Sequence, residues 1–96
     1  MSKASKLYPE INRCNKFANE LNDVSITLNR LTSSTESLFS GMTKEAILDS
    51  LNVLKNNCMQ ANESVACMKK SLNNLMNSIE DYERREKARK EKGNGK

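Results

Sequence analysis

The stretch LFSGMT, residues 38–43, lies just before the middle of the 96-residue chain, between two long runs of helical periodicity. Gly41 in this stretch is the only glycine outside the last four residues. A glycine after a helix-periodic run commonly takes the left-handed backbone conformation that ends a helix, and Thr43 is well placed to cap a following helix. The stretch therefore predicts a helical hairpin with its turn at residues 40–43.

The composition favours long helices over a globular core. Hydrophobic residues make up 36% of the chain and aromatic residues 4%, with one proline and no tryptophan. A chain this short and this poor in bulky apolar side chains cannot enclose a deep core. We expect an all-α protein, an antiparallel two-helix hairpin with unequal arms. Its single domain spans 1–90, with helices over 9–39 and 44–90, and 91–96 form a disordered basic tail.

The first arm begins with a short polar leader and a helix start at Pro9, where the missing N–H of proline costs nothing and Glu10 suits the positive helix end. Its apolar or small residues recur at spacings of three and four, which predicts one inward-facing stripe. The stripe consists of Leu7, Ile11, Cys14, Ala18, Leu21, Val24, Leu28, Leu31, Thr35 and Leu38. Phe17 and Ile26 lie off it and indicate a second apolar surface.

The second arm carries an unbroken heptad seam with alternating spacings of four and three. The seam consists of Ile47, Leu51, Leu54, Cys58, Ala61, Val65, Met68, Leu72, Leu75, Ile79 and Tyr82. Such a pattern is typical of coiled-coil packing. Further apolar residues lie outside the seam, and a two-helix hairpin has nothing left to cover them. We therefore expect a second interface with another chain, forming a four-helix bundle or a larger helical rod.

The two arms differ in length, at about 45 Å and about 70 Å for a rise of 1.5 Å per residue. Folded back from the turn, the first arm reaches about residue 73, so 74–90 should project. Cys14 should lie opposite about residue 68. A disulfide between Cys14 and Cys67 is then possible after export, although we expect the reduced pair.

The chain lacks the side chains of a catalytic or metal site. It contains no histidine, and its three cysteines form no Cys-x-x-Cys pair. We therefore expect no enzyme, no metal and no cofactor, with the cysteines acting as small apolar residues.

The net charge of +4 is concentrated at one end of the chain. Residues 84–96 hold seven basic and two acidic side chains, or +5, which leaves −1 for residues 1–83. The simpler interpretation is a solvated helix end, because basic residues suit the negative pole of a helix. The alternative is a cytosolic coiled-coil module that binds nucleic acid or anionic membrane through this end. The sequence contains no run of about 20 apolar residues, the length that a helix needs to cross a bilayer. Its N-terminal residues lack the apolar core of a signal peptide.

Two short motifs occupy the turn and the projecting end of the hairpin: Phe39-Ser40-Gly41, and Tyr82 followed four residues later by Glu86. With the hairpin itself, they resemble the WXG-type proteins of type VII secretion, over about residues 9 to 90. Phenylalanine stands where that family usually has tryptophan. The chain is therefore closer to divergent relatives, such as the accessory partners that bind the helical N-terminal domain of LXG toxins.

The resemblance implies a function in export. Proteins of this family pair side by side into four-helix bundles, in which the aromatic-x-Gly turn of one chain lies near the Tyr-x-x-x-Asp/Glu end of its partner. It implies a helical partner, either an LXG toxin or a WXG-like chain in a homo- or heterodimer, and contact with the type VII secretion ATPase. The protein would be cytoplasmic first and then secreted without a cleavable signal peptide. Nucleic acid is not an expected partner.

Tyr82 and Glu86 also have a reading that is independent of the resemblance. At a spacing of four they share one helical face, where a flat ring beside a carboxylate suits docking to a receptor. The alternative is that Tyr82 merely ends the seam while Glu86 pairs with a neighbouring Arg or Lys.

Overall fold

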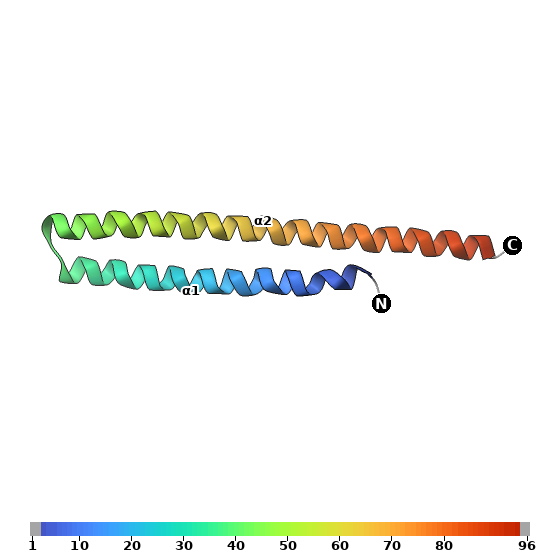
Figure 1. The fold of residues 1–96 in the computed structure, drawn as a ribbon, viewed down its shortest axis with the longest axis horizontal. Coiled ribbons are helices and arrows are strands. Elements are labelled where there is room, and N and C mark those ends of the chain that lie inside the picture. The colour runs from blue at the N-terminus through green and yellow to red at the C-terminus, as the bar shows by residue number, and fades with distance from the viewer. Residues whose placement is uncertain (1–2, 95–96) are drawn as a thin grey trace.

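The computed structural model describes residues 3–94 as three helical elements (Figure 1). A 3-10 helix, η1 (Lys3–Leu7), leads into α1 (Tyr8–Leu38), and α2 (Gly41–Asn94) runs back antiparallel to both. The molecule is a rod with extents of 84 × 16 × 12 Å, and its length is that of α2. The predicted all-α hairpin with unequal arms is confirmed.

The first arm starts earlier than the sequence pattern predicted. Pro9 lies in the first turn of α1 as expected, but the helix begins at Tyr8, and its cap residue Leu7 forms no side-chain capping bond. The predicted polar leader is η1, which continues the line of α1 (Figure 1). Its Ala4 is only 1% exposed. The leader is therefore a packed part of the hairpin.

The turn is tighter than predicted. α1 ends at Leu38, and Phe39 is extended, with its backbone N–H donating to the carbonyl oxygen of Thr35 at 3.0 Å. Gly41 has a φ of +66°, the left-handed conformation expected of it, but it is the first residue of α2. The predicted helix start at 44 was therefore wrong, and Thr43 lies inside α2. The chain reverses with only Phe39 and Ser40 between the helices, followed by the left-handed Gly41.

α2 also ends later than the predicted residue 90. The helix continues to Asn94, so a disordered tail is wrong for 91–94, while 95–96 lie outside the described residues. Glu, Lys, Arg and Ala dominate this end, and all four have high helix propensity. Ion pairs one turn apart, such as Arg84 with Asp81 at 2.5 Å, add a little support. Propensity therefore extends the helix beyond any packing contact with α1.

The inward row of the first arm, which comprises η1 and α1, keeps a strict alternation of three and four. It consists of Ala4, Leu7, Ile11, Cys14, Ala18, Leu21, Ser25, Leu28, Thr32 and Thr35, all buried or half-buried. The predicted stripe passed through Val24 and Leu31, which are exposed instead. Thr32 fits inside the row because its hydroxyl donates to the carbonyl oxygen of Leu28 at 2.9 Å. Small polar residues thus replace apolar ones where the two helices meet.

The core between the helices is a thin row. Leu28, Leu51 and Cys58 form its buried centre, with Leu21 and Ile47 packed against them. The Cys58 thiol donates to the carbonyl oxygen of Leu21 at 3.3 Å, which ties the two arms near their middle. In the part of the chain that the structure describes, no large side chain is completely enclosed. A hairpin alone therefore buries little apolar area.

Candidate interaction surface

The predicted seam of α2 divides into two rows that differ in exposure. The inner row faces α1 and consists of Leu51, Cys58, Val65, Leu72 and Ile79, which are buried or half-buried. The outer row consists of Ile47, Leu54, Ala61, Met68, Leu75 and Tyr82. Four of these six are largely exposed, and Tyr82 most of all, at 65%. The expectation that one hairpin covers its own seam is therefore wrong for the outer row.

A matching outer row lies on α1. It consists of Phe17, Val24, Leu31 and Leu38, each seven residues after the one before and each substantially exposed. The sequence pattern had placed only Phe17 on a second apolar surface and had assigned the other three to the stripe facing α2. The structure puts all four in one row.

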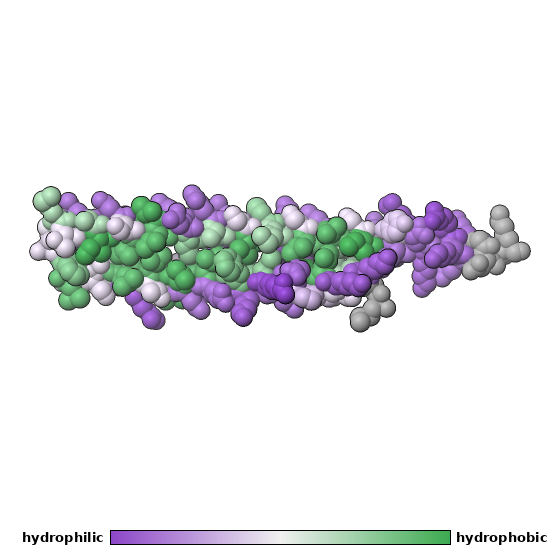
Figure 2. All heavy atoms as spheres, in the orientation of Figure 1, coloured by the Kyte–Doolittle hydropathy of each residue, from purple (hydrophilic) through white to green (hydrophobic). Residues whose placement is uncertain are grey.

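The two outer rows lie on the same side of the hairpin. Phe17 from α1 and Met68 from α2 line one groove, whose floor is formed by Cys14, Val65 and Leu72. Residues seven apart in a helix lie on the same side of it. The other residues of each outer row therefore lie on the same side of the hairpin as Phe17 and Met68. Figure 2 shows apolar side chains as a continuous band along the hairpin, ending where the polar tip of α2 begins. We call the ten residues of the two outer rows the apolar face.

The opposite side of the hairpin is mainly polar. The corresponding α1 positions are Asn15, Asn22, Asn29 and Glu36, and those of α2 are Asn52, Met59, Ala66, Asn73 and Glu80. The hairpin is therefore amphipathic as a whole, in addition to each helix being amphipathic. A surface of this kind is typical of a protein that pairs through one side.

The register of the two arms agrees with the prediction. Cys14 was expected opposite residue 68, and both residues line the same groove. Cys14 and Cys58 are buried and Cys67 is exposed, and all three are free thiols. The structure therefore contains no Cys14–Cys67 disulfide.

The two sequence motifs lie at opposite ends of the rod. Phe39 is half-exposed beside the exposed Ser40 and Gly41 at the turn. Tyr82 lies more than forty residues further along α2, which at 1.5 Å per residue is roughly 60 Å away. A single chain therefore does not bring the turn motif and the Tyr82 motif together.

The end of α2 around Tyr82 is not a bare overhang. Glu86 forms an ion pair with Arg89, as the alternative interpretation of this residue predicted. Nearby, the backbone N–H of Lys3 donates to Oε1 of Glu83 at 2.8 Å. Because η1 lengthens the first arm, it covers α2 as far as Glu83, and the projection predicted from residue 74 begins only beyond Glu83 (Figure 1).

The sequence pattern did not predict the contact between η1 and α2. A signal was present, since Ala4 lies three residues before Leu7 and extends the predicted stripe by one more step before Pro9. Glu83 is harder to recognise as a contact residue, because a carboxylate at an inward position suggests that the apolar seam has ended. Its contact is evident only once η1 is placed beside α2.

The described residues offer no metal site and no membrane span. Between residues 3 and 94 no three potential metal ligands of the His, Cys, Asp or Glu type come together. No helix in that range is both long and apolar enough to cross a bilayer.

Comparisons of the chain with protein-family models, with curated proteins and with solved structures gave no match.

Proposed function

We propose that this protein is a helical-hairpin partner protein of a type VII secretion system. It pairs with another helical chain through its apolar face and contributes Tyr82 and Glu86 to an export signal. The observation that supports this proposal most strongly is the exposed outer row on each helix, which leaves half of the α2 seam uncovered.

Pairing follows from the cost of leaving this surface in water. Burial of apolar area contributes about 25 cal/mol per Å², and leucine, methionine, phenylalanine and tyrosine side chains dominate the apolar face. A second hairpin that presents the same kind of face covers both rows at once. The product is a four-helix bundle, whose core consists of the inner and outer rows together.

Charge favours an antiparallel arrangement of two copies. Residues 33–52 around the turn carry Glu36, Glu45 and Asp49 against Lys44, or −2. Residues 84–92 carry six basic and two acidic side chains, or +4. Antiparallel pairing sets the acidic turn of one chain near the basic end of the other, whereas parallel pairing would bring like charges together. It also brings Phe39 of one chain towards the Tyr82 end of its partner.

The same apolar face is available to a heterologous partner. The family resemblance points to the helical N-terminal domain of an LXG toxin, or to another WXG-like chain. In this proposal the complex forms in the cytoplasm, engages the secretion ATPase through Tyr82 and Glu86, and leaves the cell without a cleaved signal peptide.

Co-export of the protein with its partner from a bacterium with a type VII system tests this function. Tyr82→Ala should stop export and leave partner binding largely intact, because Tyr82 is the last residue of the apolar face and its other nine residues remain to contact the partner. Tyr8→Ala is the matched control, since Tyr8 is also about half-exposed but lies on the other edge of α1. Unchanged export of the Tyr82 variant would contradict the proposal.

A second candidate function rests on Lys87, Lys90 and Lys92, which are exposed and form no ion pair with another described residue. These exposed lysines favour binding of nucleic acid or anionic membrane by the end of α2. Phosphate binding weakens steeply as salt concentration rises. Tight, salt-sensitive binding of duplex DNA by the purified chain would support this candidate over export.

A further inference from the structure

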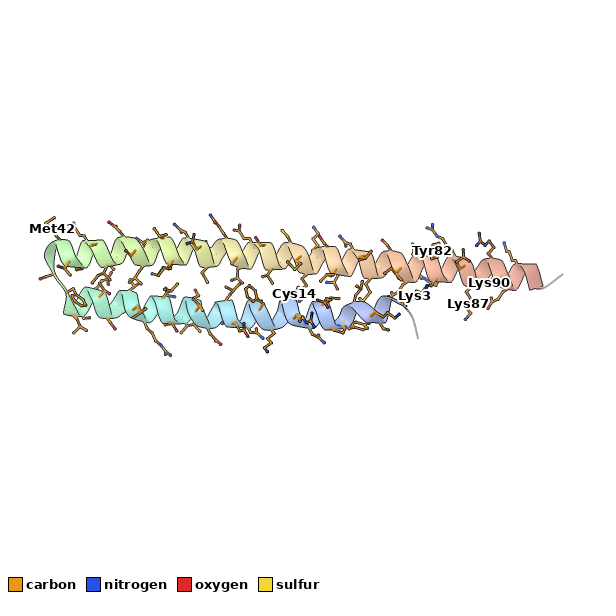
Figure 3. The ribbon with its side chains drawn as sticks, viewed as in Figure 1. Lys3, Cys14, Met42, Tyr82, Lys87 and Lys90 are labelled. Atoms are coloured by element: carbon orange, nitrogen blue, oxygen red, sulfur yellow. The ribbon has the colours of Figure 1, made fainter. Side chains whose placement is uncertain are left out.

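The N-terminal element η1 lies beside the C-terminal part of α2 (Figure 1). Lys3 and Glu83 are 80 positions apart in sequence, yet the backbone N–H of Lys3 donates to Oε1 of Glu83 at 2.8 Å. Figure 3 shows Lys3 beside the part of α2 that carries Tyr82 and Lys90. The sequence pattern had predicted that the second arm projects alone at this end of the rod.

The Glu83 carboxylate holds η1 at its first residue. The first N–H groups of a helix have no partner within the helix, so a carboxylate there satisfies a donor and offsets the positive helix end. Ala4, the next residue, is the most buried of the described residues. Glu83 and the packing of Ala4 together keep η1 against α2.

Docking of η1 increases the positive charge at this end. The described residues 84–92 carry +4, and η1 adds Lys3 and Lys6, which makes +6. Residues 7–83 hold seven basic and ten acidic side chains, or −3. The rod is therefore an electrostatic dipole whose positive end is built from both ends of the chain, and it attracts acidic partners.

A groove between η1 and α2 lies within this positive end. Ile79 and Tyr82 provide its apolar surface, and Lys3 and Lys90 lie on its rim. Its two carboxylates have partners within the chain, because Glu83 accepts from Lys3. Glu86, the other one, pairs with Arg89. The two lysine ammonium groups and the two carboxylates that line the groove sum to zero charge, so the attraction for an acidic ligand comes from the positive end of the rod around the groove.

We propose that this groove binds an acidic segment of another protein. The segment sets one large apolar side chain against Ile79 and Tyr82 and its carboxylates against Lys3 and Lys90. Ile79 and Tyr82 favour a peptide over a phosphate backbone, because such a backbone has no apolar side chain to set against them. The inference deepens the proposed export function, on which its biological meaning rests, because Tyr82 lies in the groove. It also gives η1 a function, as one wall of the site.

The test uses the purified full chain and a fluorescein-labelled synthetic peptide whose central residues are Glu-Glu-Leu-Phe-Glu-Glu. Fluorescence anisotropy should detect binding of this peptide and none of its counterpart with lysine in place of glutamate. The double variant Lys3→Glu/Lys90→Glu should weaken binding by roughly tenfold or more, or about 1.4 kcal/mol. Lys16→Glu/Lys70→Glu makes the same charge change outside the groove and should change affinity by less than about twofold.

Glu83→Ala separates the docking of η1 from the effect of net charge. Removing an acidic charge should strengthen binding of an acidic peptide if charge alone matters. We expect weaker binding, because the Lys3 N–H loses its acceptor and η1 undocks, together with faster hydrogen exchange at residues 4–8. Glu80→Ala, which makes the same charge change outside the groove, should leave exchange unaltered. Circular dichroism of each variant establishes that the hairpin is retained.

Several results would overturn the proposal. They are no binding of the acidic peptide, affinity unchanged or raised in Glu83→Ala, or tighter binding of a 20-base-pair DNA duplex or phosphatidylglycerol vesicles at physiological salt. The outcome is distinct from that of the export assay. If the unaltered chain binds no peptide but Tyr82→Ala stops export, only the groove proposal is contradicted. If the unaltered chain binds the peptide but Tyr82→Ala is exported normally, only the export function is contradicted.

Discussion

Leu51 and Leu54 lie three residues apart on one heptad seam of α2, yet Leu51 is 7% exposed and Leu54 is 50% exposed. The difference arises because α1 contacts α2 from one side only. Leu51 faces α1, and Leu54 faces outward along the edge of the contact. The hairpin thus buries about half of the apolar seam, and the other half is available to a partner.

Leu28 and Leu31 of α1 should respond differently to truncation. Leu28 is buried in the core, so Leu28→Ala should lower the free energy of unfolding by about 2–4 kcal/mol. Leu31 is exposed on the apolar face, so the effect of Leu31→Ala should grow with protein concentration as pairing develops. Urea denaturation over a range of protein concentrations measures both. Equal losses in dilute protein would show that Leu31 packs inside the hairpin.

Gly41 should be sensitive to substitution for reasons of backbone conformation alone. Its φ is +66°, and a Cβ added there would meet no atom within 4 Å. Gly41→Ala should therefore destabilise the hairpin by roughly 1–2 kcal/mol, the cost of a left-handed conformation for an L-residue. Gly41→Asn should cost less, because asparagine tolerates this conformation. Thermal denaturation is the measurement, and a neutral alanine variant would contradict the turn geometry.

Much of the fold was predictable because it depends on local rules. The spacing of apolar residues predicted two helices, the glycine at residue 41 predicted the reversal, and the equal rise of both helices predicted that Cys14 lies near Met68. Each of these inferences needs only helix geometry and backbone preference. The structure bears out all three.

The predictions were wrong where a polar residue occupies an inward position that an apolar residue was expected to fill. Ser25 and Thr32 occupy inward positions of α1 because their side chains are small, and the Thr32 hydroxyl is satisfied by its own helix. A search for apolar residues passed them over and selected Val24 and Leu31 instead. Glu83 was missed in the same way, because its function depends on a partner 80 residues distant. Tertiary contacts of this kind leave no periodic signal.

The three cysteines should differ in reactivity. Cys67 is exposed and should react rapidly with a thiol reagent such as Ellman's reagent, whereas Cys14 and Cys58 are buried and should react only as the hairpin opens. In denaturant all three should react at similar rates. Equal rates in the folded chain would contradict the packing of α1 on α2.

Phe39 distinguishes a structural turn from a composite export surface. Its backbone N–H, and not its side chain, donates to Thr35, and the ring is half-exposed. Phe39→Leu should therefore change the melting temperature by no more than about 2 °C, as is common for surface substitutions. Export should nevertheless fall, because the proposed antiparallel pairing places the ring near the partner's Tyr82 end. Normal export of this variant would limit Phe39 to packing at the turn.

The most direct test of the apolar face is the association of the purified chain, followed by sedimentation and by the concentration dependence of thermal unfolding. We predict that the chain sediments at twice its mass of 10.9 kDa and that its unfolding midpoint rises with protein concentration. Leu54→Glu/Leu75→Glu should abolish both effects. Val53→Glu/Met59→Glu, at equally exposed positions off the face, should preserve them. A stable 10.9 kDa monomer whose midpoint is constant up to roughly 100 μM would contradict the pairing of two copies through the apolar face.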